Sequence, residues 1–133
     1  TKLPLILKGI THPAYAKKAI EIGVNGIVVS NHGGRVLDTL VTTMDILPKI
    51  VEVVDNKIPI LLDGGITRGT DILKALALGA SAVMIGKPIM YGLATAGALG
   101  VAHSLKILKD ELEISMALTG CKTLKDISKD ILF

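Results

Sequence analysis

Short aliphatic runs alternate with longer segments of helical periodicity along this chain, and the unit occurs four times. The runs predict strands at about 4–8, 26–30, 58–62 and 82–86. Each run is almost continuously apolar, which is typical of parallel strands that are covered on both faces. A glycine-rich or polar turn follows each strand and leads into a helical segment. The pattern therefore predicts four consecutive βα units and an α/β fold.

The helical segments between the strands have recognisable ends. Thr11 as cap and Pro13 in the first turn mark the start of the first helix, which should end near Gly23. Pro48 lies inside the second segment and either kinks that helix or argues against it. Gly79 suits the end of the third. The second and third helices are thus predicted at about 42–54 and 69–79.

The last region is predicted as a long helix at about 92–119 and a short one at 123–129, capped by Thr123 with Asp126 three residues on. A stripe of apolar residues in the long helix is read as core, and Cys121 as a packing residue. His12, His103, Asp71, Asp110 and Glu111 are read as structural or surface residues. The stripe consists of Leu105, Leu108, Leu112 and Met116.

Four βα units form either a small open sheet or half of an eight-stranded barrel. A complete barrel needs about 200 residues or more, and this chain has 133. An open sheet would leave two apolar strand edges unpaired, which promotes aggregation. We therefore expect a half-barrel that is completed by sequence missing upstream of Thr1 or by another chain.

Composition narrows the function further. The net charge of +3 is mild, and three aromatic residues offer little for stacking bases, so no nucleic-acid partner is expected. The single cysteine excludes an internal disulfide and suggests a cytoplasmic location. No apolar run approaches the ~20 residues of a membrane span, no signal peptide is recognisable, and no metal site is expected.

Residues able to do chemistry gather where the predicted strands end. The second strand leads into Ser-Asn-His-Gly-Gly-Arg at 30–35, which places a proton acceptor, His32, three residues before a fixed cation, Arg35. This pair suits an anionic substrate that must lose a proton. Lys8 ends the first strand, while the glycine-rich segments 63–69 and 86–88 follow the last two. In a parallel barrel these ends share one face, and the loops after the last two strands bind phosphate, with a helix N-terminus behind them.

Together these segments resemble the FMN-dependent 2-hydroxy-acid oxidases and dehydrogenases, which include glycolate oxidase, lactate oxidase and flavin-type lactate dehydrogenase. The resemblance covers essentially all 133 residues, as the C-terminal half of the family's (β/α)8 TIM barrel domain. It is carried by Leu7-Lys8-Gly9, the segment 30–35, Asp63-Gly64-Gly65-Ile66, the segment 68–80, Asp110-Glu111-Leu112-Glu113 and Met116-Ala117-Leu118-Thr119-Gly120-Cys121.

The resemblance implies a role for each candidate site residue. His32 would be the base that takes a proton from a small (S)-2-hydroxy acid, and Arg35 would bind the substrate carboxylate. Oxygen or another acceptor would reoxidise the flavin. The cofactor-binding candidates are Lys8 and Ser30 at the flavin pyrimidine edge, Asp63 at the ribityl chain, and Gly64, Gly65, Ile66, Thr67, Gly86 and Lys87 around the phosphate.

Two positions depart from the family pattern, which commonly has arginine where this chain has Thr67 and Lys87. Lys87 keeps the charge without the planar fork of a guanidinium. Thr67 loses the charge, for which the neighbouring Arg68 could compensate. Considered without its neighbours, His32 could be a structural histidine, and Asp63 could be a turn cap.

Two other readings stay open. A phosphate-binding barrel of the inosine-monophosphate dehydrogenase kind needs a nucleophilic cysteine on a barrel loop, whereas Cys121 lies in the C-terminal helical region. Alternatively, the chain is a catalytically inactive half-barrel that self-associates or pairs with a missing half. The family's substrate-side tyrosines belong to its N-terminal half, so we expect the isolated chain to be inactive and homo-oligomeric.

Overall fold

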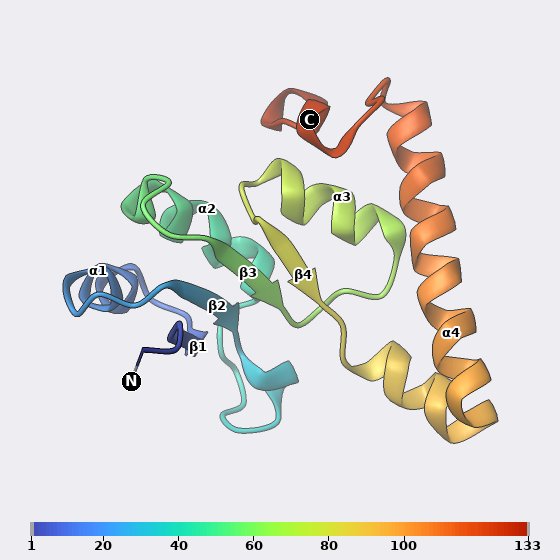
Figure 1. The fold of residues 1–133 in the computed structure, drawn as a ribbon, viewed down its shortest axis with the longest axis horizontal. Coiled ribbons are helices and arrows are strands. Elements are labelled where there is room, and N and C mark those ends of the chain that lie inside the picture. Colours follow the sequence, from blue (N-terminus) through green and yellow to red (C-terminus); the bar gives the residue numbers. More distant parts are fainter. Residues whose placement is uncertain (1, 133) are drawn as a thin grey trace.

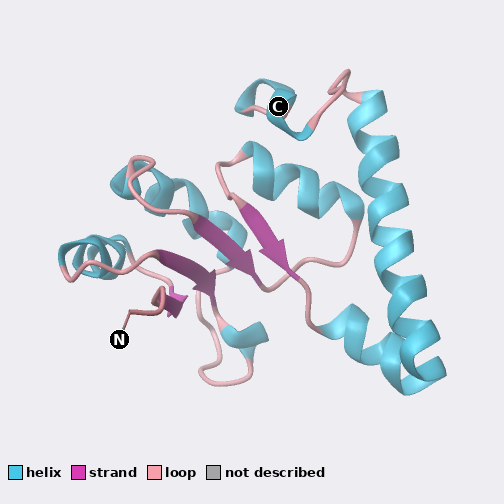
Figure 2. Ribbon diagram, viewed as in Figure 1, coloured by secondary structure: helices cyan, strands magenta, loops and turns pink. Residues whose placement is uncertain are grey.

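The computed structural model of the protein describes residues 2–132. It contains one parallel sheet whose four strands lie side by side in chain order (Figure 1). The strands are β1 (Ile6–Ile10), β2 (Gly26–Ser30), β3 (Ile60–Asp63) and β4 (Ala82–Met84). A helix follows each strand (Figure 2), namely α1 (Pro13–Glu21), α2 (Thr43–Val54), α3 (Gly69–Ala77) and α4 (Lys87–Leu118). The four predicted βα units are therefore confirmed.

A single aliphatic core lies between the sheet and its helices. Ile27 and Val29 of β2 and Leu62 of β3 point to this side and are fully buried. Leu47 and Ile50 of α2 pack against them. Because side chains alternate along a strand, the register that pairs Ser30 with Asp63 places these two polar residues together on the opposite, inner face.

Two strands begin later than predicted, and prolines explain the shift. Pro4 and Pro59 have no N–H to donate to a ladder, so pairing in β1 begins at Ile6 and β3 begins at Ile60. At its other end β1 extends to Ile10 through an irregularity between Lys8 and Ile10, which has the form of a β-bulge at the intervening residue.

The helix caps agree with the prediction except at the start of α1. There His12, not Thr11, is the cap, because its Nδ1 accepts a hydrogen bond of 3.1 Å from the Ala14 N–H. α2 continues through Pro48 to Val54. The Thr123–Asp126 capping box is present, but it heads a short 3₁₀ turn (Leu124–Asp126), followed by a second such turn, Lys129–Ile131.

The long C-terminal helix is the largest departure from the sequence prediction. α4 begins at Lys87, and non-helical backbone at Ala96 and Gly97 divides it into a short and a long segment (Figure 1). Of the predicted apolar stripe, Leu108 is buried in the core but Leu105 is 48% exposed. Reading the whole stripe as core was therefore wrong for this chain. None of the helices within residues 2–132 is long and apolar enough to cross a membrane.

Candidate active site

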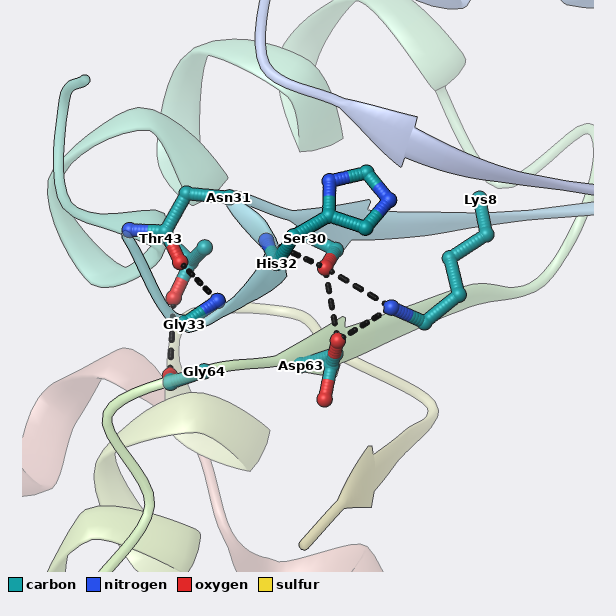
Figure 3. Close-up of polar contacts among 8 residues, drawn as sticks. All are labelled: Lys8, Ser30, Asn31, His32, Gly33, Thr43, Asp63 and Gly64. Atoms are coloured by element: carbon teal, nitrogen blue, oxygen red, sulfur yellow. Dashed lines mark hydrogen bonds and ion pairs between the residues drawn. The ribbon is translucent and has the colours of Figure 1, made fainter. Parts of the chain in front are cut away.

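A polar cluster occupies the inner face of the sheet at the carboxyl ends of three strands (Figure 3). The Lys8 ammonium of β1 donates hydrogen bonds to Ser30 Oγ (3.0 Å) and to Asp63 Oδ2 (2.5 Å). The Ser30 hydroxyl donates in turn to the same carboxylate oxygen at 2.6 Å. Ser30 is buried, and the side chains of Lys8 and Asp63 are 39% and 17% exposed. Three predicted site residues from separate strands are thus in direct contact.

The cluster holds Asp63 in its charged form. Burial by itself would raise the pKa of this carboxyl, but the hydrogen bonds from Lys8 and Ser30, together with the Lys8 charge, outweigh burial and lower the pKa below its ordinary value of 3.8. The ionised carboxylate then acts only as an acceptor. It therefore keeps the Lys8 ammonium at a fixed point of the inner face.

The turn after β2 presents His32 in an unusual backbone conformation. Its φ of 55° lies in the left-handed region, and Ser30 Oγ accepts the His32 N–H at 3.1 Å. The ring lies close to the bulge of β1, since a Cβ added to Gly9 would come within 2.8 Å of His32 Cε1. Gly9 also has a φ of 101°, which side-chain-bearing residues rarely adopt. A glycine at position 9 is therefore required to seat the imidazole.

Two further contacts join this turn to the loop after β3. The Thr43 hydroxyl, which is buried, donates to the Gly64 carbonyl at 2.9 Å. Asn31 Oδ1 accepts the Gly33 N–H at 3.1 Å and would lie only 2.9 Å from a Cβ at Gly64. Gly64 consequently permits the two loops to approach each other (Figure 3).

An open cavity of about 950 Å³ lies over the polar cluster, within the size range of cofactor and ligand pockets. All predicted site residues except Ser30 line it, and Ser30 lies beneath it in the cluster. These lining residues are Lys8, His32, Arg35, Asp63, Gly64, Gly65, Ile66, Thr67, Gly86 and Lys87. The Ile66 side chain is largely buried in the core, so mainly its backbone faces the cavity.

Cationic side chains dominate the rim of this cavity. Arg35 and Lys87 are exposed, and neither forms an ion pair with any residue of the range 2–132. Lys87 extends towards the turn after β2, where its Cε lies 4.0 Å from a Cβ built on Gly33. Lys74 of α3, which the sequence did not single out, also lines the cavity. The arrangement suits a ligand that carries more than one negative charge.

Arg68 does not compensate for the missing charge at Thr67. Its guanidinium donates to Glu111 Oε1 of α4 at 3.0 Å, and it does not line the cavity. Thr67 itself donates its hydroxyl to Asp71. Glu111, which the sequence suggested was a surface or helix-end charge, is instead the partner of Arg68 and of the Gly69 N–H.

Asn31, Thr43, Lys74 and Glu111 contact or line this site and were given no site role from the sequence. Asn31 lies two residues before Gly33 in a pattern typical of an Asx turn, so it carried a local signal. Thr43 and Glu111 act on residues 21 and 42 positions away, and no local pattern marks such contacts. Cys121 is buried and lies outside the cavity lining, which argues against a cysteine-dependent barrel chemistry.

Comparison with known proteins identifies the family of this chain. The sequence matches the family of FMN-dependent dehydrogenases over residues 1–133. It is 55% identical to a peroxisomal (S)-2-hydroxyacid oxidase of Arabidopsis thaliana over 98% of this chain and 36% of the relative. An L-lactate oxidase of Nostoc sp. is 54% identical over the same shares.

Solved structures agree in fold. A mandelate oxidase superposes with a TM-score of 0.92 at 46% identity, over 97% of this chain and 39% of that protein. A protein described as a lactate oxidase of Pediococcus acidilactici gives 0.94 at 47% identity, over 97% and 36%. The chain spans about a third of the length of the curated relatives it matches, and its βα units match part of their TIM barrel. The chain therefore belongs to the family of FMN-dependent 2-hydroxy-acid oxidases and dehydrogenases.

Proposed function

We propose that this chain is the C-terminal part of an enzyme that uses FMN to oxidise a small (S)-2-hydroxy acid, such as glycolate or lactate, to the 2-oxo acid. One observation carries the proposal: His32 and Arg35 of the turn after β2 and the fixed Lys8 ammonium of β1 face the same cavity, from two neighbouring βα units. The relatives whose names specify (S)-2-hydroxyacid or L-lactate oxidases support the substrate class.

The residues of the cavity fit a flavin mononucleotide. The Lys8–Ser30–Asp63 cluster offers a cation and a carboxylate acceptor at one end. At the other end, the space beside Gly65 and Gly86 is open, with no atom within 4 Å of an added Cβ. Backbone N–H groups there and the Lys87 ammonium can approach a phosphate closely. FMN, when bound, accepts the two electrons that leave the hydroxy acid.

The chain's own residues would carry out the acid–base chemistry. Arg35 would bind the substrate carboxylate in a bidentate pair and so orient the hydroxyl-bearing carbon. Oxidation of the alcohol to a carbonyl removes two electrons and two protons. His32 would accept one of those protons, and the flavin, when bound, would take up the other together with the two electrons. The fixed Lys8 charge would stabilise negative charge that develops beside it.

A second, non-enzymatic proposal concerns the 133-residue chain by itself. β1 and β4 have no outer strand neighbour among residues 2–132, and apolar side chains near these edges are exposed, including Leu5, Ile6 and Met84. Such edges pair readily with other chains. We expect the isolated chain to self-associate and to lack turnover; a monomeric, active preparation would refute this.

The names of plant relatives specify the peroxisome, so a cytoplasmic location remains only a proposal.

The enzymatic proposal is tested with the flavin-containing protein that carries this chain. His32→Gln should abolish the anaerobic bleaching of flavin absorbance by (S)-lactate and glycolate, while FMN stays bound. His103→Gln, on the distant part of α4, is the matched control and should reduce flavin at the unaltered rate. Unchanged reduction by His32→Gln would remove His32 from its role.

A further inference from the structure

The N-terminus of α3 is already occupied by carboxylates. A helix N-terminus presents unpaired N–H groups and is a common phosphate site. Here Glu111 Oε2 accepts the Gly69 N–H at 2.8 Å, and Asp71 Oδ2 accepts the N–H groups of Thr67 and Arg68 at 2.9 Å each. The backbone donors of residues 67–69 are therefore taken by protein groups.

With the Glu111 carboxylate in place, the contact between α3 and α4 leaves no room for a second anion at this end. A Cβ built on Gly69 would lie 2.2 Å from the Leu112 nitrogen and 2.4 Å from the Glu111 carbonyl carbon. Gly69 itself is buried. The close approach of α4 thus brings the Glu111 carboxylate against the helix end, where it supplies the negative charge that this end favours.

Glu111 is also held electrostatically. The hydrogen bond from the Gly69 N–H, followed by that from Arg68, lowers the pKa of the Glu111 carboxyl below its ordinary value. The same interaction turns the Arg68 side chain towards α4. Both effects leave the open backbone at Gly65 and Gly86 and the Lys87 ammonium available to a phosphate in the cavity.

We propose that Glu111 is a positioning residue for the cofactor phosphate. Its carboxylate closes the N-terminus of α3, draws Arg68 away from the cavity and fixes the segment 64–69, so that the phosphate binds at the Gly64 and Gly65 backbone and at Lys87. This inference rests on the proposed FMN site. It adds that Glu111 decides which backbone N–H groups of the segment 64–69 remain free to bind phosphate.

The first probe is inorganic phosphate, which is titrated into the isotope-labelled chain while its backbone amide resonances are recorded. In the unaltered chain, phosphate should shift the Gly65 and Lys87 amides and leave Gly69 and Thr70 unmoved. Glu111→Ala should make the Gly69 and Thr70 amides respond as well, because the helix end loses its internal anion. Glu113→Ala is the control, since Glu113 lies one half-turn further along the same helix and pairs with Lys109 of α4 at 3.4 Å.

FMN and riboflavin provide the second measurement. Glu111→Ala should weaken FMN binding by about fivefold or more and leave riboflavin binding unchanged, because riboflavin has no phosphate. Should Glu111→Ala fail to fold, Glu111→Gln preserves the side-chain size and one acceptor while removing the charge, and it should show the same two changes.

Three results would overturn the proposal. They are a phosphate response at Gly69 in the unaltered chain, a Gly69 amide that stays silent in the Glu111 variants, and an FMN affinity that matches the Glu113→Ala control. Failure of every variant to bind FMN would instead count against the proposed cofactor site, while the Gly69 amide would still decide the role of Glu111.

Discussion

Replacing Lys8 with methionine tests whether the polar cluster on the inner face stabilises the fold. The substitution keeps an unbranched side chain of nearly the same length but leaves the Asp63 carboxylate with Ser30 as its only partner among the cluster residues. The expected result is a loss in the free energy of unfolding, because a largely buried charge loses its counter-ion.

The magnitude follows from the geometry. A hydrogen bond to a charged group contributes about 1.5–3 kcal/mol when it is shielded from water. The Lys8 side chain is 39% exposed, so solvent screening reduces this contribution. Fully exposed ion pairs contribute at most about 1 kcal/mol. We therefore expect Lys8→Met to lower the free energy of unfolding by about 1–2 kcal/mol at pH 7.

Urea unfolding followed by circular dichroism measures this loss, and its pH dependence identifies the cause. The pKa of Asp63 is depressed in the folded chain, so its stabilisation is complete above the ordinary value of 3.8 and is lost as the pH falls below that value. The difference between Lys8→Met and the unaltered chain should shrink accordingly in acid. Lys57→Met, an exposed residue, is the control. Equal stability of both variants at pH 7, or a difference that does not shrink as the pH falls below 3.8, would refute the reasoning.

Two further substitutions test the seating of His32 and the loss of charge at position 67. Gly9→Ala should destabilise the chain by about 1–3 kcal/mol and displace the His32 ring, which its proton resonances would report. Gly23→Ala shares the positive φ but has open space around it, so equal effects of the two alanines would exclude a clash with the ring. Thr67→Arg should tighten FMN binding in a fluorescence titration, because a cation is added beside the phosphate-facing backbone, whereas Thr95→Arg should leave it unchanged; a weaker affinity of Thr67→Arg would contradict the phosphate assignment.

The sequence predicts the strands well because β2, β3 and their turns are set by local patterns. Ile27 and Val29 alternate with residues of the inner face, and proline and glycine mark the ends of each run. The same patterns bring His32, Arg35 and Lys8 to one edge of a parallel sheet. The sequence therefore predicts that these three side chains face one cavity, although it does not single out other lining residues such as Lys74.

The missed features depend on contacts between distant segments. The break in α4 at Ala96 and Gly97 brings Gly92 and Gly100 so close that a Cβ on Gly100 would be 1.9 Å from the Gly92 carbonyl oxygen. No periodic pattern in the sequence predicts the contact between these two glycines. Glu111 likewise looks like any exposed acid until α4 is folded against the end of α3. Long-range packing, not local propensity, decides both.

The most direct test of the central claim is a visible-absorption titration of the purified chain with FMN, repeated with riboflavin. The arrangement of Lys8, Gly65 and Lys87 predicts a saturable perturbation of the flavin spectrum, with FMN binding more tightly than riboflavin because of its phosphate. An unperturbed spectrum, or equal binding of the two flavins, would contradict the claim that this chain carries the phosphate and pyrimidine-side contacts of an FMN site.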